Sequence, residues 1–132
     1  VVGIGEASVE EIDRINIHRA SYLAMHRALD ALSVKAAYIL VDGNRFIPYQ
    51  DVPHLCIVKG DGKYLSIAAA SILAKTYRDA YMEHISGEYP IYGWDRNKGY
   101  PTEVHRRAVL EHGPSPHHRL SFRVSEPQLR LF

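Results

Sequence analysis

Residues 36–43 read AAYILVDG, and residues 55–62 read LCIVKGDG. In both segments a short apolar run is followed by turn residues that include an aspartate and a glycine. Short, uninterrupted apolar runs are typical of strands buried on both faces, as in a parallel α/β sheet. We therefore predict strands over 36–41 and 55–58, with Asp42 and Asp61 just beyond their carboxyl ends.

The residues before the first strand carry a helical pattern. Ser8 and Glu11 have the spacing of a capping box, which places a helix start near Val9. Apolar residues then recur at steps of three and four. This pattern predicts one helix that ends near Leu32 or Ser33.

Two further helices are expected after the second strand. The first opens at Ile67 and runs to about Ile85. The stretch 87–101 is rich in proline, glycine and aromatic residues, which indicates a structured loop rather than a linker. Thr102 is expected to cap a helix through Glu111, and the prolines beyond it leave an irregular tail.

The composition is that of an ordinary globular protein. The 132 residues predict one domain, and 46% hydrophobic with 23% charged residues excludes a disordered tail, a collagen-like repeat or a coiled-coil rod. No apolar run approaches the ~18 residues of a membrane span, and the first residues of the given sequence do not have the pattern of a signal peptide. The single cysteine, Cys56, cannot form an internal disulfide, so we expect a cytoplasmic location.

The net charge of +1 does not indicate a nucleic-acid partner, but the charges are unevenly placed. The segment 94–123 holds an excess of basic residues and four histidines, including the neighbours His117 and His118. The excess fits either a solvated surface or a face that contacts phosphates. The histidine pair lacks the further ligands and spacing of a zinc site. The basic residues are Arg96, Lys98, Arg106, Arg107, Arg119 and Arg123.

Asp42 and Asp61 are the residues best placed for chemistry. Ligands of open α/β sheets bind at the carboxyl ends of strands, where two parallel neighbours would bring both carboxylates together. Close carboxylates repel unless a cation or proton lies between them, and oxygen ligands suit Mg²⁺ or Mn²⁺. The alternative is that each aspartate only opens a turn.

Several segments resemble the ribonuclease HII family in the right order over roughly residues 3–124. The central one is KGDGKYLSIAAASILAK at 59–75, followed by Arg78-Asp79. The other similar segments are 11–17 (EIDRINI), 39–45 (ILVDGNR), 92–105 with its GYPT motif at 99–102, and 118–122 (HRLSF).

This resemblance implies a ribonuclease H-like layered α/β/α fold and hydrolysis of the RNA strand in RNA–DNA hybrids, including ribonucleotides embedded in duplex DNA. By motif, Asp42 and Asp61 would be catalytic and would bind Mg²⁺ or Mn²⁺. Tyr100 matches the tyrosine that touches the sugar at the RNA–DNA junction. Lys98 and Arg119 are expected to lie near phosphates.

The family's first two carboxylates lie in a D-E-A-G-R-G segment that this chain lacks. Gly5-Glu6-Ala7 is only superficially similar, because a glycine stands where the aspartate should be and the helix follows at once. We therefore expect the chain to be the C-terminal portion of one domain, without its N-terminal strands, whose missing segment supplies the remaining carboxylates. A non-catalytic nucleic-acid-binding module or an inactive fragment is the alternative.

Overall fold

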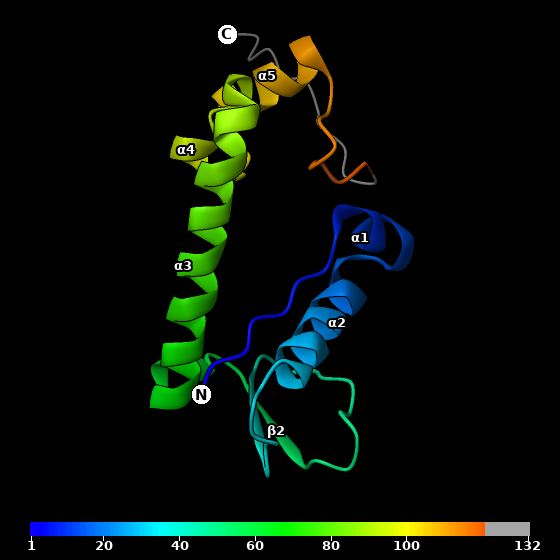
Figure 1. The fold of residues 1–132 in the computed structure, drawn as a ribbon, viewed down its shortest axis with the longest axis vertical. Coiled ribbons are helices and arrows are strands. Elements are labelled where there is room, and N and C mark those ends of the chain that lie inside the picture. Colours follow the sequence, from blue (N-terminus) through cyan, green and yellow to red (C-terminus); the bar gives the residue numbers. More distant parts are fainter. Residues whose placement is uncertain (121–132) are drawn as a thin grey trace, which may run out of the picture. The chain divides into compact units, whose positions relative to one another are not determined.

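The computed structural model describes residues 1–120, which form two compact units with the boundary between Ala74 and Lys75. The elements follow one another along the chain as helices, two strands and further helices (Figure 1). They are α1 (Val9–Ile15), α2 (Ile17–Asp30), β1 (Ile39–Asp42), β2 (His54–Ile57), the 3-10 turn η1 (Gly60–Gly62), α3 (Leu65–Glu88), the 3-10 turn η2 (Pro90–Tyr92), α4 (Trp94–Asn97) and α5 (Glu103–His112).

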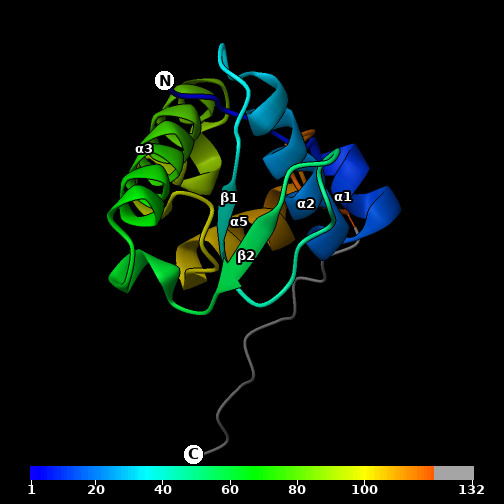
Figure 2. The same cartoon turned by 90° about the horizontal axis from the view of Figure 1, so that it is seen from below.

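The first unit is built on a parallel pair of strands (Figure 2). β1 and β2 run in register from Ile39 opposite His54 to Asp42 opposite Ile57. Both predicted strands and their parallel arrangement are therefore confirmed, although β1 begins three residues later than expected.

Burial of the sheet is uneven. Ile39 and Val41 of β1 are buried and pack with Met25 and Leu29 of α2. Leu55 of β2 is 45% exposed, so the expectation of two strands buried on both faces is wrong for β2. A run of apolar residues shows that a strand can be buried. Whether it is buried depends on which residues pack against each face of the sheet.

The predicted first helix is two helices. The capping box forms as expected, with the Ser8 hydroxyl accepting the Glu11 N–H at 3.2 Å. Asn16 then breaks the helix, because its backbone (φ 71°, ψ 167°) is far from a helical conformation. Its side chain also caps α2 by accepting the Arg19 N–H at 3.1 Å, so one residue ends α1 and starts α2.

The second unit, from Lys75 onward, has a core of large apolar side chains from α3, η2, α4 and α5. The stretch 87–101 is a structured loop as predicted, and it contains η2 and α4. α5 is capped by Thr102 and ends at Gly113, where φ is 75°. The buried core residues are Met82, Ile85, Tyr92, Trp94 and Ala108.

Ser121, Phe122 and Arg123, which belong to the predicted closing motif and basic segment, and Pro127 of the predicted irregular tail, lie outside the described residues. Within residues 1–120, no helix has the length and apolar character needed to cross a bilayer.

Candidate active site and nucleic-acid interface

Asp42 is the last residue of β1, and its carboxylate ties this strand to the segment that follows β2. The Gly60 N–H donates a hydrogen bond to Asp42 Oδ1 at 3.0 Å. Next to it, the Gly43 N–H donates to the carbonyl oxygen of Ile57 at 3.0 Å. The carboxyl ends of the two strands are therefore joined both by the backbone and by the aspartate.

Asp61 lies in η1, one residue after the amide that binds Asp42. The chain enters η1 through Lys59, whose φ is 54°. Gly60 is buried, and a Cβ there would lie 2.7 Å from Cδ1 of Ile67, so the turn packs closely on the start of α3. Asp42 and Asp61 are both exposed. The tertiary structure thus brings the two predicted aspartates to one edge of the sheet.

The donor chemistry of this edge fits a hard divalent cation, because carboxylate oxygens are the ligands that Mg²⁺ and Mn²⁺ prefer. The hydrogen bond from Gly60 uses Oδ1 of Asp42 and leaves its second oxygen for another partner. In the part of the chain that the structure covers, no cluster of three or more His, Cys, Asp or Glu residues could hold a metal ion. The edge therefore brings together two aspartates whose carboxylate oxygens are suited to such a cation.

Tyr100 lies in the second unit, on a loop whose backbone is held on both sides. Its N–H donates to the Asn97 carbonyl at 2.9 Å, and its own carbonyl accepts the Thr102 N–H at 2.8 Å. Lys98 and Gly99 precede it in the left-handed region, with φ of 53° and 86°. Tyr100 is 66% exposed. A fixed backbone thus presents an exposed phenol to solvent.

The two predicted phosphate neighbours have different surroundings. Lys98 Nζ lies 2.5 Å from Oε1 of Glu83 on α3, and the lysine side chain is only 19% exposed. Its charge is therefore paired in this structure. Arg119 is partly buried and directly follows His118.

Sequence reasoning missed a hydrogen-bonded pair of histidines beside Tyr100. Nε2 of His105 and Nε2 of His118 are 3.1 Å apart, and the two rings stack. Burial lowers the pKa of His105, and burial together with the neighbouring imidazoles lowers the pKa of His118 to about 4. Both rings are neutral near pH 7. No sequence signal connects them, because they lie thirteen positions apart in different local contexts.

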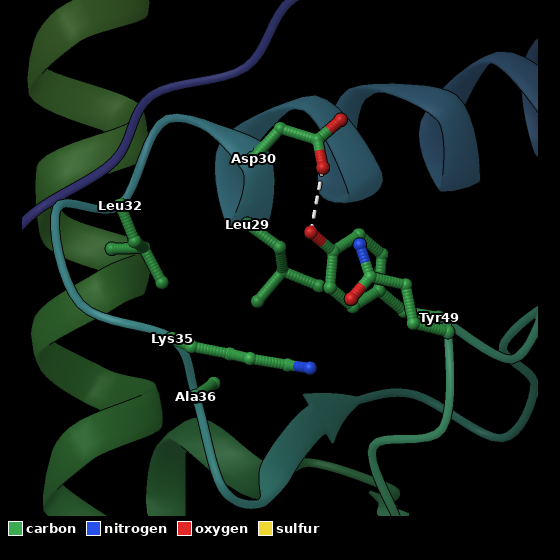
Figure 3. Close-up of a pocket in the computed structure, with 7 residues that line it drawn as sticks. Leu29, Asp30, Leu32, Lys35, Ala36 and Tyr49 are labelled. Carbon is green, nitrogen blue, oxygen red and sulfur yellow. Dashed lines mark hydrogen bonds between the residues drawn. The ribbon is translucent and has the colours of Figure 1, made fainter.

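A shallow pocket of about 290 Å³ opens beside the end of α2 (Figure 3). The Tyr49 hydroxyl donates to Asp30 Oδ1 at 2.6 Å across its wall, and Lys35 and Ala36 line it just before β1. It therefore lies toward the amino-terminal end of β1, whereas Asp42 ends that strand. This pocket is not part of the aspartate edge.

Comparison with known proteins identifies the family. Residues 3–125 match the family model for ribonuclease HII. The chain is 61% identical over 129 residues to "Ribonuclease HII" of Bacteroides thetaiotaomicron, covering 97% of this chain and 64% of that protein. Proteins of the same name from Phocaeicola vulgatus and Parabacteroides distasonis are 59% and 61% identical, with 97% of this chain and 65% and 64% of those proteins covered.

The chain thus spans slightly less than two thirds of the length of these curated relatives. The family match and the parallel strand pair with its flanking helices confirm the expected α/β, ribonuclease H-like fold class. The chain therefore belongs to the ribonuclease HII family.

Proposed function

We propose that this chain contributes to metal-dependent endonucleolytic hydrolysis of the RNA strand in RNA–DNA hybrids, including single ribonucleotides embedded in duplex DNA. The observation that carries the proposal is the joining of Asp42 to η1, which holds two aspartates at one strand edge in a member of this family. The proposed setting is the cytoplasm.

Asp42 and Asp61 would hold Mg²⁺ or Mn²⁺, with further carboxylates from an Asp-Glu segment that this chain does not contain. Such an ion lowers the pKa of a water nucleophile and neutralises the charge that develops on the leaving oxygen. The role of the aspartates is to supply negative charge and fixed oxygen positions. The Gly60 N–H orients Asp42, because it occupies one of the two carboxylate oxygens.

Nucleic-acid recognition would rest on the second unit. The exposed ring of Tyr100 can pack on a sugar, and its hydroxyl can reach a 2′-OH, the group that distinguishes RNA from DNA. Lys98 and Arg119 would contact phosphates, which position a duplex without reading its sequence. Lys98 would have to exchange Glu83 for a phosphate to do so.

The experiment is cleavage of a hybrid by a protein that joins this chain to the family's Asp-Glu segment. Asp42→Asn and Asp61→Asn should each abolish Mg²⁺-dependent cleavage, since each removes a negative charge. In Asp42→Asn the new amide oxygen can still accept the Gly60 N–H, so the turn should be kept. Asp51→Asn is the matched control, because Asp51 is exposed and precedes β2 at the other end of the sheet. Full activity of the Asp42→Asn protein would rule out the metal assignment.

The same experiment tests the alternative of a non-catalytic binding module. If the wild-type protein binds the hybrid with or without metal but never cleaves it, the proposed nuclease activity is wrong and the chain is a binding module. Hybrid cleavage by the 132-residue chain alone would show that the two aspartates suffice without the Asp-Glu segment.

A further inference from the structure

The hydrogen bonds around Ser115 determine where His118 carries its proton. Nδ1 of His118 lies 2.8 Å from the backbone N of Ser115. A backbone N–H can only donate, so Nδ1 must be the acceptor, and the proton of the neutral ring is on Nε2. Ser115 is only 7% exposed, which keeps water from competing for this bond.

The protonated Nε2 of His118 in turn determines the tautomer of His105. The two Nε2 atoms face each other at 3.1 Å, and the Trp94 indole N–H also points at Nε2 of His105 at 3.3 Å. Two donors converge on this nitrogen, so it must be unprotonated. The proton of neutral His105 is therefore on Nδ1.

Nδ1 of His105 lies 3.3 Å from the carbonyl oxygen of Tyr100. The assigned N–H thus points at Tyr100, whose carbonyl also accepts the Thr102 N–H. Pro101 follows Tyr100 and further restricts its backbone to extended conformations. The direction in which the exposed ring leaves the loop depends on this held backbone.

We propose that His118 and His105 are positioning residues for Tyr100: they hold its carbonyl through a directed chain of hydrogen bonds that runs from Ser115. The inference rests on the proposed function, in which Tyr100 contacts the nucleic acid. Neither histidine touches the substrate, and their effect is exerted through the Tyr100 backbone.

The chain of bonds requires both rings to be neutral, because a proton on Nε2 of His105 would oppose the N–H of His118. The titratable groups that face the pair are Tyr92 of η2 and His117, whose ring contacts Tyr81 of α3. His117 is hydrogen-bonded to Tyr81, and its Nε2 lies 4.0 Å from Glu88. The rings of the buried residues Tyr92 and Trp94, which are 3% and 2% exposed, contact both histidines.

The first test is the tautomer of each histidine in the 132-residue chain, measured by ¹⁵N–¹H correlation of the imidazole nitrogens. At about pH 7.5 we expect His118 to carry its proton on Nε2 and His105 to carry its proton on Nδ1. His118, whose pKa is lowered to about 4, should keep this tautomer at about pH 5. An ordinary histidine, with a pKa near 6.5, would be protonated at about pH 5. A proton on Nε2 of His105 at the higher pH would overturn the proposal.

The second test compares His105→Leu with His105→Asn, read out by the amide resonances of Tyr100 and Thr102. Asparagine places an N–H donor near the position of Nδ1 and should keep the wild-type resonances, whereas leucine should shift them. His112→Asn is the matched control, because His112 lies on the same helix with a half-exposed side chain. Equal shifts in the leucine and asparagine variants would show a general packing effect and refute positioning.

The third test separates this inference from the proposed function. The same variants, in the protein with the Asp-Glu segment, are titrated with a DNA duplex containing one ribonucleotide and with an all-DNA duplex. We expect His105→Leu to reduce the preference for the ribonucleotide by roughly two- to tenfold, the range of one neutral hydrogen bond. His105→Asn should retain it.

Two possible results would contradict different parts of this argument. If the wild type shows no preference between the duplexes, the proposed function fails at Tyr100, while the tautomers still report the histidine pair. If the wild type shows the preference and His105→Leu keeps it in full, Tyr100 needs no positioning by His105 and the inference is wrong.

Discussion

Oδ1 of Asp42 accepts the backbone N–H of Gly60 at 3.0 Å, so a side chain at the end of one strand orients the turn that follows the next. This bond makes a stability prediction that is separate from catalysis. Asp42→Ala leaves the Gly60 N–H without its partner and should lower the free energy of unfolding by about 1–2 kcal/mol. Asp42→Asn should cost less, and urea unfolding of both variants measures the difference.

Tyr100 should contribute to recognition through both its ring and its hydroxyl. Tyr100→Phe is expected to keep hybrid binding but to lose about 0.5–1.5 kcal/mol of discrimination at the ribonucleotide. Tyr100→Ala should do more harm, because it also removes packing on the sugar. Cleavage of a long hybrid and of a duplex with one ribonucleotide gives the comparison, and unchanged rates for Tyr100→Ala on both would make Tyr100 a loop-packing residue.

Glu83 should restrain nucleic-acid binding, because it holds the ammonium group of Lys98 at 2.5 Å. Glu83→Gln frees this charge for a phosphate and is expected to strengthen hybrid affinity modestly, by up to about fivefold, since exposed ion pairs contribute about 1 kcal/mol or less. Glu10→Gln makes the same change in net charge on α1 and serves as the control. Equal gains in both variants would point to net charge rather than to Lys98.

Gly5 should resist substitution although it lies outside any helix or strand. A Cβ there would lie 2.1 Å from the carbonyl oxygen of Ala24, so residue 5 passes directly against the backbone of α2. Gly5→Ala should lower the free energy of unfolding by about 1–3 kcal/mol. Gly87→Ala on α3 meets nothing within 4 Å and should instead be neutral or stabilising by up to about 1 kcal/mol. Thermal or urea unfolding of the two variants makes the comparison.

His118 should make stability depend on pH in the acidic range. Burial and the neighbouring imidazoles lower its pKa from 6.5 to about 4 in the folded chain. The unfolded chain therefore binds more protons between these values, so the free energy of unfolding falls as the pH drops from 6.5 to about 4. The slope from this group is at most about 1.4 kcal/mol per pH unit.

His118→Gln removes this titration, so the stability difference between wild type and variant should narrow as the pH falls through that window. Chemical unfolding at several pH values measures it, with His112→Gln as the control. If the difference in unfolding free energy between wild type and His118→Gln stays constant from neutral pH to about pH 4, the lowered pKa of His118 is not the cause of the pH dependence.

Local features of the molecule were predictable from the sequence because each rests on neighbouring residues. The capping box at Ser8 and Glu11 needs only four consecutive residues, and the cap of α5 needs only the hydroxyl of Thr102 just before the first helical residue. The helix break at Asn16 also has a local cause, yet apolar residues continue at helical spacing across it, and this periodicity concealed the break.

The two aspartates were identified by sequence alone, first as residues that follow apolar runs and then by the family motif around them. Their closeness in space depends on the tertiary structure, because β1 and β2 must pair in parallel and the turn at Gly60 must pack against Ile67. The distance between two segments in the sequence does not show whether their strands are neighbours in the sheet.

The histidine pair, too, could be predicted from the sequence only in part. His105 and His118 are visible in the sequence as members of two separate family-like segments, and the sequence gives no sign that the two rings meet. Their contact depends on the loop after Gly113 returning Ser115 and His118 to the buried Trp94. Tautomers and lowered pKa values arise from desolvation and directed hydrogen bonds, which are properties of three-dimensional surroundings, so only the tertiary structure decided them.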